Sequence, residues 1–216
     1  MPKFAGAIFD MDGLMLDTER PALCAWKQAA LKQGFFISDA VFFRTMGVSE
    51  QVCRQVYADK FAGGFPYEET RERVRLILDD EFERNGIALR PGLIPLLDHL
   101  AELNMPLAVA TSTRAERALW KLEKTGLKGR FSAFAFGDEV ERGKPAPDIF
   151  LLAMQRLGKN PADCIGFEDS PAGLLGLHSA GVRSVFVKDL IEPRPEVLST
   201  VWRRCENLAA AVELIE

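Results

Sequence analysis

The chain has 216 residues, a net charge of −4 and an apolar fraction of 48%. This length suits one large domain, or a core domain with a smaller one inserted, and the apolar fraction is enough to bury a hydrophobic core. The sequence shows no basic stripe, N-terminal leader or membrane-length apolar stretch, which argues against nucleic-acid binding and membrane insertion and predicts a soluble, cytoplasmic protein, by default a monomer.

The first predicted element is a strand, an apolar run that ends abruptly at Asp10. Short runs with both faces apolar are typical of central strands in a parallel sheet. The predicted strands, separated by helix-like segments, cover residues 4–9, 106–110, 133–136, 164–167 and 182–187. Strands that alternate with helices predict an α/β fold, in which a Rossmann-like parallel sheet forms a core flanked by helices.

Residues 17–88 differ from the rest because they form a helical stretch without a convincing strand. Within 69–85, Val74, Leu78 and Phe82 fall on one helical face, as expected for a helix that packs on a core. We interpret this stretch as an α-helical cap domain inserted after the first strand. The core domain would then comprise residues 1–16 and 89–216, with linkers near 14–18 and 87–92.

The first candidate site is Asp10-Met11-Asp12-Gly13, directly after the first strand. Ligands of open α/β sheets bind at the carboxyl ends of the strands, and Gly13 allows a sharp turn there. A pair of aspartates alone is weak evidence, because polar loops commonly follow strands. Its position after a buried strand predicts a functional site.

Thr111-Ser112-Thr113 follows the predicted strand at 106–110. A hydroxyl and free N–H groups between a strand and a helix can bind an anion. Taken alone, these residues are explained more simply by a plain helix cap, for which Thr113 is a candidate.

Lys144 lies in a loop between Gly143 and two prolines, so its ammonium group is held on a rigid segment. Glu168 and Asp169 follow another short apolar strand, and Ser170-Pro171 is a typical helix start. Acids gathered at one sheet edge repel each other unless a hard cation such as Mg²⁺ binds between them. Taken together, the four groups predict phosphoryl transfer through an aspartyl nucleophile and a metal ion.

These four motifs resemble those of the haloacid dehalogenase-like superfamily, in order and along the whole chain, including a helical cap. The resemblance implies that Asp10 attacks phosphorus, while Asp12 protonates the leaving group and then activates water. It implies that Thr111 binds the phosphoryl group, aided by Met11 and Ser112, and that Lys144 holds Asp10 and the phosphoryl oxygens. Mg²⁺ would bind the Asp10 carboxylate, the Asp12 carbonyl and the Asp169 carboxylate, with Glu168 acting through water or as a partner of these ligands.

The resemblance implies a phosphatase that acts on a small phosphorylated sugar, polyol or nucleoside monophosphate. Substrate choice would depend on the cap and its linkers, with candidates Leu14, Met15, Arg44, Met46 and Gly47. Arg44 could meet an anionic part of the substrate, although a surface charge explains it as well.

Two other functions stay open at this point. A sugar-phosphate mutase similar to β-phosphoglucomutase shares the motifs, but it has a histidine and an asparagine where this chain has Ala22 and Ala115. A non-catalytic module that binds a phosphorylated ligand is less favoured, because such family members usually lack a catalytic carboxylate. A protein phosphatase is disfavoured because the cap would exclude large substrates.

Overall fold

The computed structural model describes residues 3–215. Its centre is a parallel sheet with the strand order β3-β2-β1-β4-β5-β6. The strands are β1 (Gly6–Phe9), β2 (Leu107–Thr111), β3 (Ala133–Phe136), β4 (Cys164–Glu168), β5 (Arg183–Val187) and β6 (Arg203–Cys205). The predicted α/β class is therefore confirmed, and the five predicted strands are present with boundaries shifted by a few residues at most.

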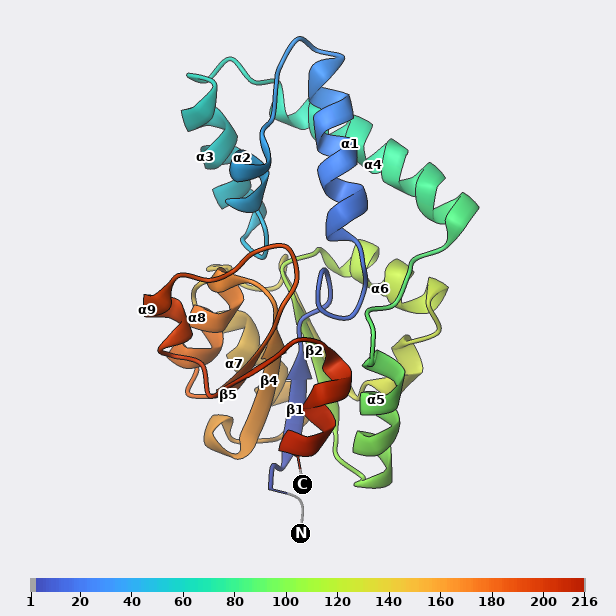
Figure 1. Cartoon of the computed structure of the whole chain (residues 1–216), viewed down its shortest axis with the longest axis vertical. Coiled ribbons are helices and arrows are strands. Elements are labelled where there is room, and N and C mark those ends of the chain that lie inside the picture. The colour runs from blue at the N-terminus through green and yellow to red at the C-terminus, as the bar shows by residue number, and fades with distance from the viewer. Residues whose placement is uncertain (1–2, 216) are drawn as a thin grey trace.

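Helices cover both faces of this sheet, and further helices stand beyond its carboxyl edge (Figure 1). The core helices are α5 (Leu93–Glu102), α6 (Ala115–Lys124), α7 (Asp148–Leu157), α8 (Pro171–Ser179) and α9 (Pro195–Leu198). Short 3₁₀ segments cover Lys128–Arg130, Pro161–Asp163 and Leu208–Leu214. The helices beyond the edge are α1 (Glu19–Leu31), α2 (Asp39–Phe43), α3 (Glu50–Lys60) and α4 (Tyr67–Asn85).

The alternation of side chains along β1 divides the core into two layers. Phe9 packs with α5 and α6 on one face, whereas Ile8 packs with α7 on the other. All four residues of β1 are buried, because helices cover both faces of a parallel sheet. The first strand is thus fixed from both sides, and the residue that follows it has a well-defined position.

The four helices α1–α4 pack around two apolar clusters, which are separate from the two layers of the sheet. Trp26 stacks on Tyr57 with 4.9 Å between ring centroids, and Tyr57 stacks on Phe65 at the same distance. The predicted stripe on α4 is buried at Val74 and Phe82.

The chain passes between this helical part and the sheet through two adjacent linkers. The Asp17 N–H donates to the Ala88 carbonyl at 2.8 Å, and the Arg90 N–H donates to the Met15 carbonyl at 2.9 Å. The predicted division into core and cap at residues 16/17 and 88/89 stays a prediction.

The sequence-based reading missed one strand, β6, which extends the sheet beyond β5. It has only three residues, and Arg203 and Arg204 are exposed, so no apolar run marks it. Arg204 forms two ion-paired hydrogen bonds with Glu192, at 2.6 and 3.0 Å. A short, positively charged strand is typical of a sheet edge, because it discourages pairing with other chains.

Among residues 3–215, no helix has both the length and the apolar character that a membrane span requires.

Glu139 ties the loop after β3 to α7. Its carboxylate accepts hydrogen bonds from Arg156 at 2.7 and 3.0 Å and from the Phe136 N–H at 3.0 Å. The hydrogen bonds from Arg156 keep the pKa of Glu139 below its ordinary value of 4.5. Since the folded-state pKa is depressed, this stabilisation is present above the unfolded pKa and is lost as the pH falls through the folded pKa. We expect Glu139→Gln to lower the unfolding free energy by about 1 kcal/mol or less at neutral pH. Urea titrations should show a smaller loss of unfolding free energy at acidic pH than at neutral pH. The exposed control Glu141→Gln should show no loss at either pH. An equal loss for Glu139→Gln at both pH values would contradict the role given to the Glu139–Arg156 ion pair.

Candidate active site

The register of the sheet brings the predicted site residues to one edge. Phe9 is paired with Val109 on β2 and with Phe167 on β4. One or two positions further along these strands are Asp10, Thr111, Glu168 and Asp169, at the carboxyl ends where ligands of open α/β sheets bind. The convergence of these four residues therefore follows from strand pairing, whereas Lys144 reaches them from the loop between β3 and α7.

Lys144 forms the buried centre of the site. Its side chain is fully buried, and Nζ donates to Asp10 Oδ1 at 2.5 Å and to Glu168 Oε1 at 2.6 Å. Burial lowers the pKa of Lys144, but the two carboxylates outweigh it and hold the pKa above its ordinary value. The ammonium is therefore charged, and it fixes one oxygen of Asp10. Burial nevertheless raises the pKa of Asp10 to about 7, although Lys144 lowers it.

Glu168 and Asp169 differ in how far their oxygens are occupied. The Glu168 Oε2 atom accepts from the Asp169 N–H, the Ser170 N–H and the Ser170 hydroxyl, at 2.7, 2.8 and 3.1 Å. Asp169 Oδ1 is buried and has no hydrogen-bond partner in the described chain. Burial, followed by repulsion from Glu168 and Asp10, raises the pKa of Asp169 well above its ordinary value. One oxygen from each of Asp10, Glu168 and Asp169 lies within 4.8 Å of the others, so this cluster can hold a cation.

Gly13 is the residue that lets the loop after β1 pass close to this cluster. Its φ is +86°, and a Cβ at this position would lie 2.4 Å from Asp169 Oδ2. A side chain there would be strained by the backbone conformation and would also collide with the carboxylate. The glycine that the sequence placed at a sharp turn therefore also makes room for Asp169.

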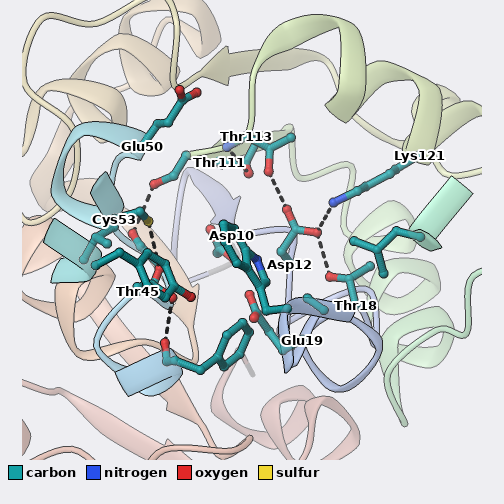
Figure 2. Close-up of a pocket in the computed structure, with 18 of the residues that line it drawn as sticks. Asp10, Asp12, Thr18, Glu19, Thr45, Glu50, Cys53, Thr111, Thr113 and Lys121 are labelled. Atoms are coloured by element: carbon teal, nitrogen blue, oxygen red, sulfur yellow. Dashed lines mark hydrogen bonds and ion pairs between the residues drawn. The ribbon is translucent and has the colours of Figure 1, made fainter. Parts of the chain in front are cut away.

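Asp12 is held by three donors at the wall of a cavity (Figure 2). Its Oδ1 accepts from Thr18 Oγ1 at 2.7 Å and from Lys121 Nζ at 2.5 Å, and its Oδ2 accepts from Thr113 Oγ1 at 2.7 Å. Burial raises the pKa of Asp12, but Lys121 and the two hydroxyls outweigh it, so the net pKa lies below the ordinary value. Asp12 is thus an oriented carboxylate in its ionised form.

The sequence suggested that Thr113 caps the helix that follows it, but it does not. The helix α6 has Arg114 at its N-cap, and the Thr113 side chain turns to Asp12 instead. Ser170 does cap α8, accepting from the Gly173 N–H, with Pro171 at the first helical position.

The other predicted phosphate-binding residues lie around the same cavity. Thr111 is buried, and its Oγ1 accepts from the Thr113 N–H at 3.1 Å. Ser112 Oγ donates to the Gly47 carbonyl of the helical part at 3.1 Å. No carbonyl in residues 3–215 accepts a backbone hydrogen bond from the N–H of Met11 or Asp12, so both groups are free to bind an anion.

The cavity itself measures about 260 Å³ and lies between the sheet edge and the helices α1–α4. Of the residues predicted to select the substrate, only Gly47 lines it. Leu14 and Met15 are fully buried in the core beside β1, Met46 is buried among the cap aromatics, and Arg44 is exposed at the end of α2. None of these four residues lines the described cavity, and their role in substrate selection stays a prediction. The lining instead includes Trp26, Tyr57 and Glu19.

Sequence reasoning missed three charged residues of the cavity, Lys121, Glu19 and Glu50. Lys121 is buried together with Ala118 and Leu122 on one face of α6. A lysine within the apolar stripe of an amphipathic helix is a detectable signal, because an unpaired lysine is almost never buried. Glu19 begins α1, where an acidic residue is common and gives no such signal. Burial, followed by repulsion from Asp12, raises the pKa of Glu19 to about 8.

Lys121 should contribute to turnover by orienting Asp12. We expect Lys121→Met to lower kcat by about tenfold to a hundredfold, because a misplaced proton-transfer group is costly. Without the ammonium the pKa of Asp12 rises, so the limb of the pH–rate profile that Asp12 controls should move to higher pH. Steady-state assays should show partial rescue by Lys121→Arg and little effect of Lys124→Met, one turn further along α6. An unchanged profile for Lys121→Met would remove this role.

Comparison with known proteins agrees with this geometry. The family model described as haloacid dehalogenase-like hydrolase matches residues 4–181. A phosphorylated carbohydrates phosphatase of Thermotoga maritima is 31% identical over 183 residues, covering 83% of this chain and 82% of the relative. The fructose-1-phosphate phosphatase of Escherichia coli is 32% identical over 193 residues, covering 86% and 97%. A crystal structure of a putative β-phosphoglucomutase from Thermotoga maritima superimposes with a TM-score of 0.76 at 28% identity, covering 98% of this chain and 99% of that one.

The chain therefore belongs to the haloacid dehalogenase-like hydrolases, as its four motifs predict. The parallel sheet of this chain and its superposition on this solved structure confirm the predicted Rossmann-like core.

Proposed function

We propose that the protein is a Mg²⁺-dependent phosphatase that hydrolyses a small phosphorylated metabolite through an aspartyl-phosphate on Asp10. The observation that carries this proposal is the arrangement of two aspartates with separate environments at one cavity. Asp10 is fixed by Lys144, whereas Asp12 is fixed by Lys121, Thr18 and Thr113. Carboxylates in different environments can take different roles in one reaction.

The residues present fit a divalent cation. Asp169 Oδ1 is buried without a partner in the described chain, and it faces two other carboxylates. We assign the metal to the carboxylates of Asp10 and Asp169 and the carbonyl of Asp12, with Glu168 as a partner of the ligands, because its own oxygens are occupied. Mg²⁺ is the hard cation that such a set suits, and when bound it would neutralise negative charge on the phosphoryl oxygens.

The chain's own residues supply the other parts of the reaction. An oxygen of Asp10 attacks phosphorus while Lys144 keeps the carboxylate in place and screens it from Glu168. Thr111, Ser112 and the free N–H of Met11 bind the phosphoryl oxygens. Asp12 donates a proton to the departing alkoxide and later takes one from the attacking water. Because Asp12 is ionised in the free protein, it must gain a proton on substrate binding, which the negative charge of the incoming phosphate favours.

The cap residues 17–88 would enclose the reaction and limit it to small substrates. Several relatives are named for small phosphorylated carbohydrates or polyols, among them a hexitol phosphatase of Escherichia coli that is 32% identical over 183 residues. This supports a sugar, polyol or nucleoside monophosphate as the substrate class. The reaction involves a small molecule and neither a nucleic acid nor a membrane, and we propose that the protein is a cytoplasmic monomer.

A mutase is less well supported than a phosphatase, although related structures carry that name. The position where such enzymes have a histidine is Ala22, which lines the cavity. No histidine lines the cavity within residues 3–215. A requirement for a sugar bisphosphate activator would favour the mutase.

The proposed function is tested by hydrolysis of p-nitrophenyl phosphate. We expect turnover with Mg²⁺, loss of turnover in excess chelator, and full recovery when Mg²⁺ is restored. Turnover that persists unchanged in excess chelator would contradict the metal assignment. No turnover under any of these conditions would favour the non-catalytic module.

A further inference from the structure

The loop after β5, residues 188–192, joins the sheet to the helical part at a point far from both linkers in the sequence. Leu190 and Ile191 pack against the apolar cluster of α1–α3. In Figure 1 this loop rises from the end of β5 toward those helices. Glu192, at the end of the loop, pairs with Arg204 of β6 at 2.6 Å. The loop is therefore held by the sheet and also contacts the helical part.

Asp189 of this loop binds both linkers. Its side chain is 1% exposed, and its Oδ1 lies 2.7 Å from Arg20 Nη1 in the first turn of α1 and 3.0 Å from Arg90 Nη2 in the second linker. The Lys188 carbonyl accepts a further hydrogen bond from Arg90 at 3.2 Å. A carboxylate is costly to bury without cations, so Asp189 and the two arginines hold one another in place. The proposed reaction does not use this carboxylate.

Arg20 lies next to the residue that orients Asp12. Thr18 is the N-cap of α1, two positions before Arg20, and its hydroxyl donates to Asp12 Oδ1 at 2.7 Å. The position of this hydroxyl depends on where the first turn of α1 lies relative to the sheet. The ion pair between Arg20 and Asp189 fixes that turn from the opposite end of the sheet edge, because β5 lies beyond β4 in the strand order.

We propose that Asp189 is a positioning residue for Asp12, the group that transfers protons. By binding Arg20 and Arg90, it holds the start of α1 on the sheet. This keeps the Thr18 hydroxyl on the Asp12 carboxylate. A displacement of about 1 Å at a reacting group can cost about a hundredfold in rate, so an anchor outside the cavity can control proton transfer. The inference rests on the proposed phosphatase function and adds to it a residue that touches neither the substrate nor the reacting atoms.

Substrates that differ in their leaving group separate this role from a general loss of structure. p-Nitrophenolate departs without a proton, whereas the alkoxide of a sugar, polyol or nucleoside needs one from Asp12. The quantity to compare is kcat/KM, because it covers the reaction only as far as the departure of the leaving group. It is measured for p-nitrophenyl phosphate and for whichever of glucitol 6-phosphate, fructose 1-phosphate and uridine 5′-monophosphate the wild type hydrolyses fastest.

In Asp189→Asn we expect kcat/KM for the alkyl phosphate to fall by about tenfold, while the value for p-nitrophenyl phosphate stays within about twofold. The loss is limited because the other two donors to Asp12 remain. Arg20→Gln removes only one of the two ion pairs, at a side chain that is largely exposed, and should cause a smaller loss of the same selective kind. It decides the question even if Asp189→Asn does not fold. Glu192→Gln, in the same loop but paired with β6, is the matched control and should change neither value.

A double-mutant cycle tests whether Thr18 is the link. Thr18→Val should itself cause the selective loss, and the addition of Asp189→Asn should then cost less than about a further twofold, because the hydroxyl to be positioned is gone. Losses that multiply in the cycle would overturn the inference. So would an equal fall for both substrates, or no fall, in a folded Asp189→Asn or Arg20→Gln variant.

Failure of the proposed function would look different. A wild type without turnover of p-nitrophenyl phosphate would overturn the phosphatase assignment itself. Turnover of p-nitrophenyl phosphate but of none of the three alkyl phosphates would overturn the substrate class, and the inference with it, because Asp12 would then have no alkoxide to protonate.

Discussion

Asp10→Asn should abolish turnover, with kcat reduced by about 10⁴-fold or more, because a neutral amide cannot act as the nucleophile. The side chains have nearly the same shape, so the fold should persist. The substitution also removes a buried carboxylate that is crowded by Glu168. The variant should therefore unfold at a temperature no lower than that of the wild type at neutral pH.

The matched control for this prediction is Asp59→Asn, at an exposed position of α3. It makes the same chemical change at a distance from the cavity and should keep wild-type kcat. A folded Asp10→Asn enzyme with activity within about tenfold of the wild type would contradict the nucleophile assignment.

Lys144→Met should be the most destabilising change at the site. The lysine side chain is fully buried between Asp10 and Glu168, and its loss leaves two buried carboxylates without their cation. Breaking such a buried ion pair costs about 3–5 kcal/mol of unfolding free energy. Urea unfolding in the presence of chelator should show this loss, whereas the exposed Lys32→Met should show almost none.

The cost of Lys144→Met should depend on pH. Asp10 already has a folded-state pKa of about 7, against an ordinary value of 3.8, and removal of the lysine raises it further. A carboxyl group with a raised folded-state pKa binds its proton more tightly in the folded protein, so the unfolding free energy falls as the pH rises. The destabilisation should therefore be smaller below the Asp10 pKa than above it. An equal loss of unfolding free energy below and above the Asp10 pKa would show that lost packing, and not charge, is responsible.

The candidate site could be predicted from the sequence because its residues follow short apolar strands. Once β1, β2 and β4 pair in register, the positions of Asp10, Thr111 and Asp169 are determined. Lys144 is on a loop, but glycine and proline mark that loop as rigid. Strand pairing thus brings Asp10, Thr111 and Asp169 together, and the position of Lys144 depends on its loop.

The lining of the cavity could not be predicted in the same way, because it depends on how α1–α4 pack over the sheet edge. Each of these helices carries several apolar residues, and the packing of the helices against one another decides which of these side chains point toward the cavity. Leu14 and Met15 looked like linker residues facing a substrate, yet they belong to the hydrophobic core. Glu19 and Tyr57 occupy ordinary helical positions in the sequence, and only the folded structure shows that they line the cavity.

The central claim, covalent catalysis by Asp10, is tested most directly by trapping the intermediate. The enzyme is mixed with a rapidly hydrolysed phosphomonoester and Mg²⁺, quenched in acid during turnover, and digested for mass spectrometry. We predict that one phosphoryl group is found on the peptide that contains Asp10, and that it is absent in Asp10→Asn. A phosphoryl group on another residue would contradict covalent catalysis by Asp10. So would the absence of any phosphorylated peptide from samples quenched while a burst of product formation is under way.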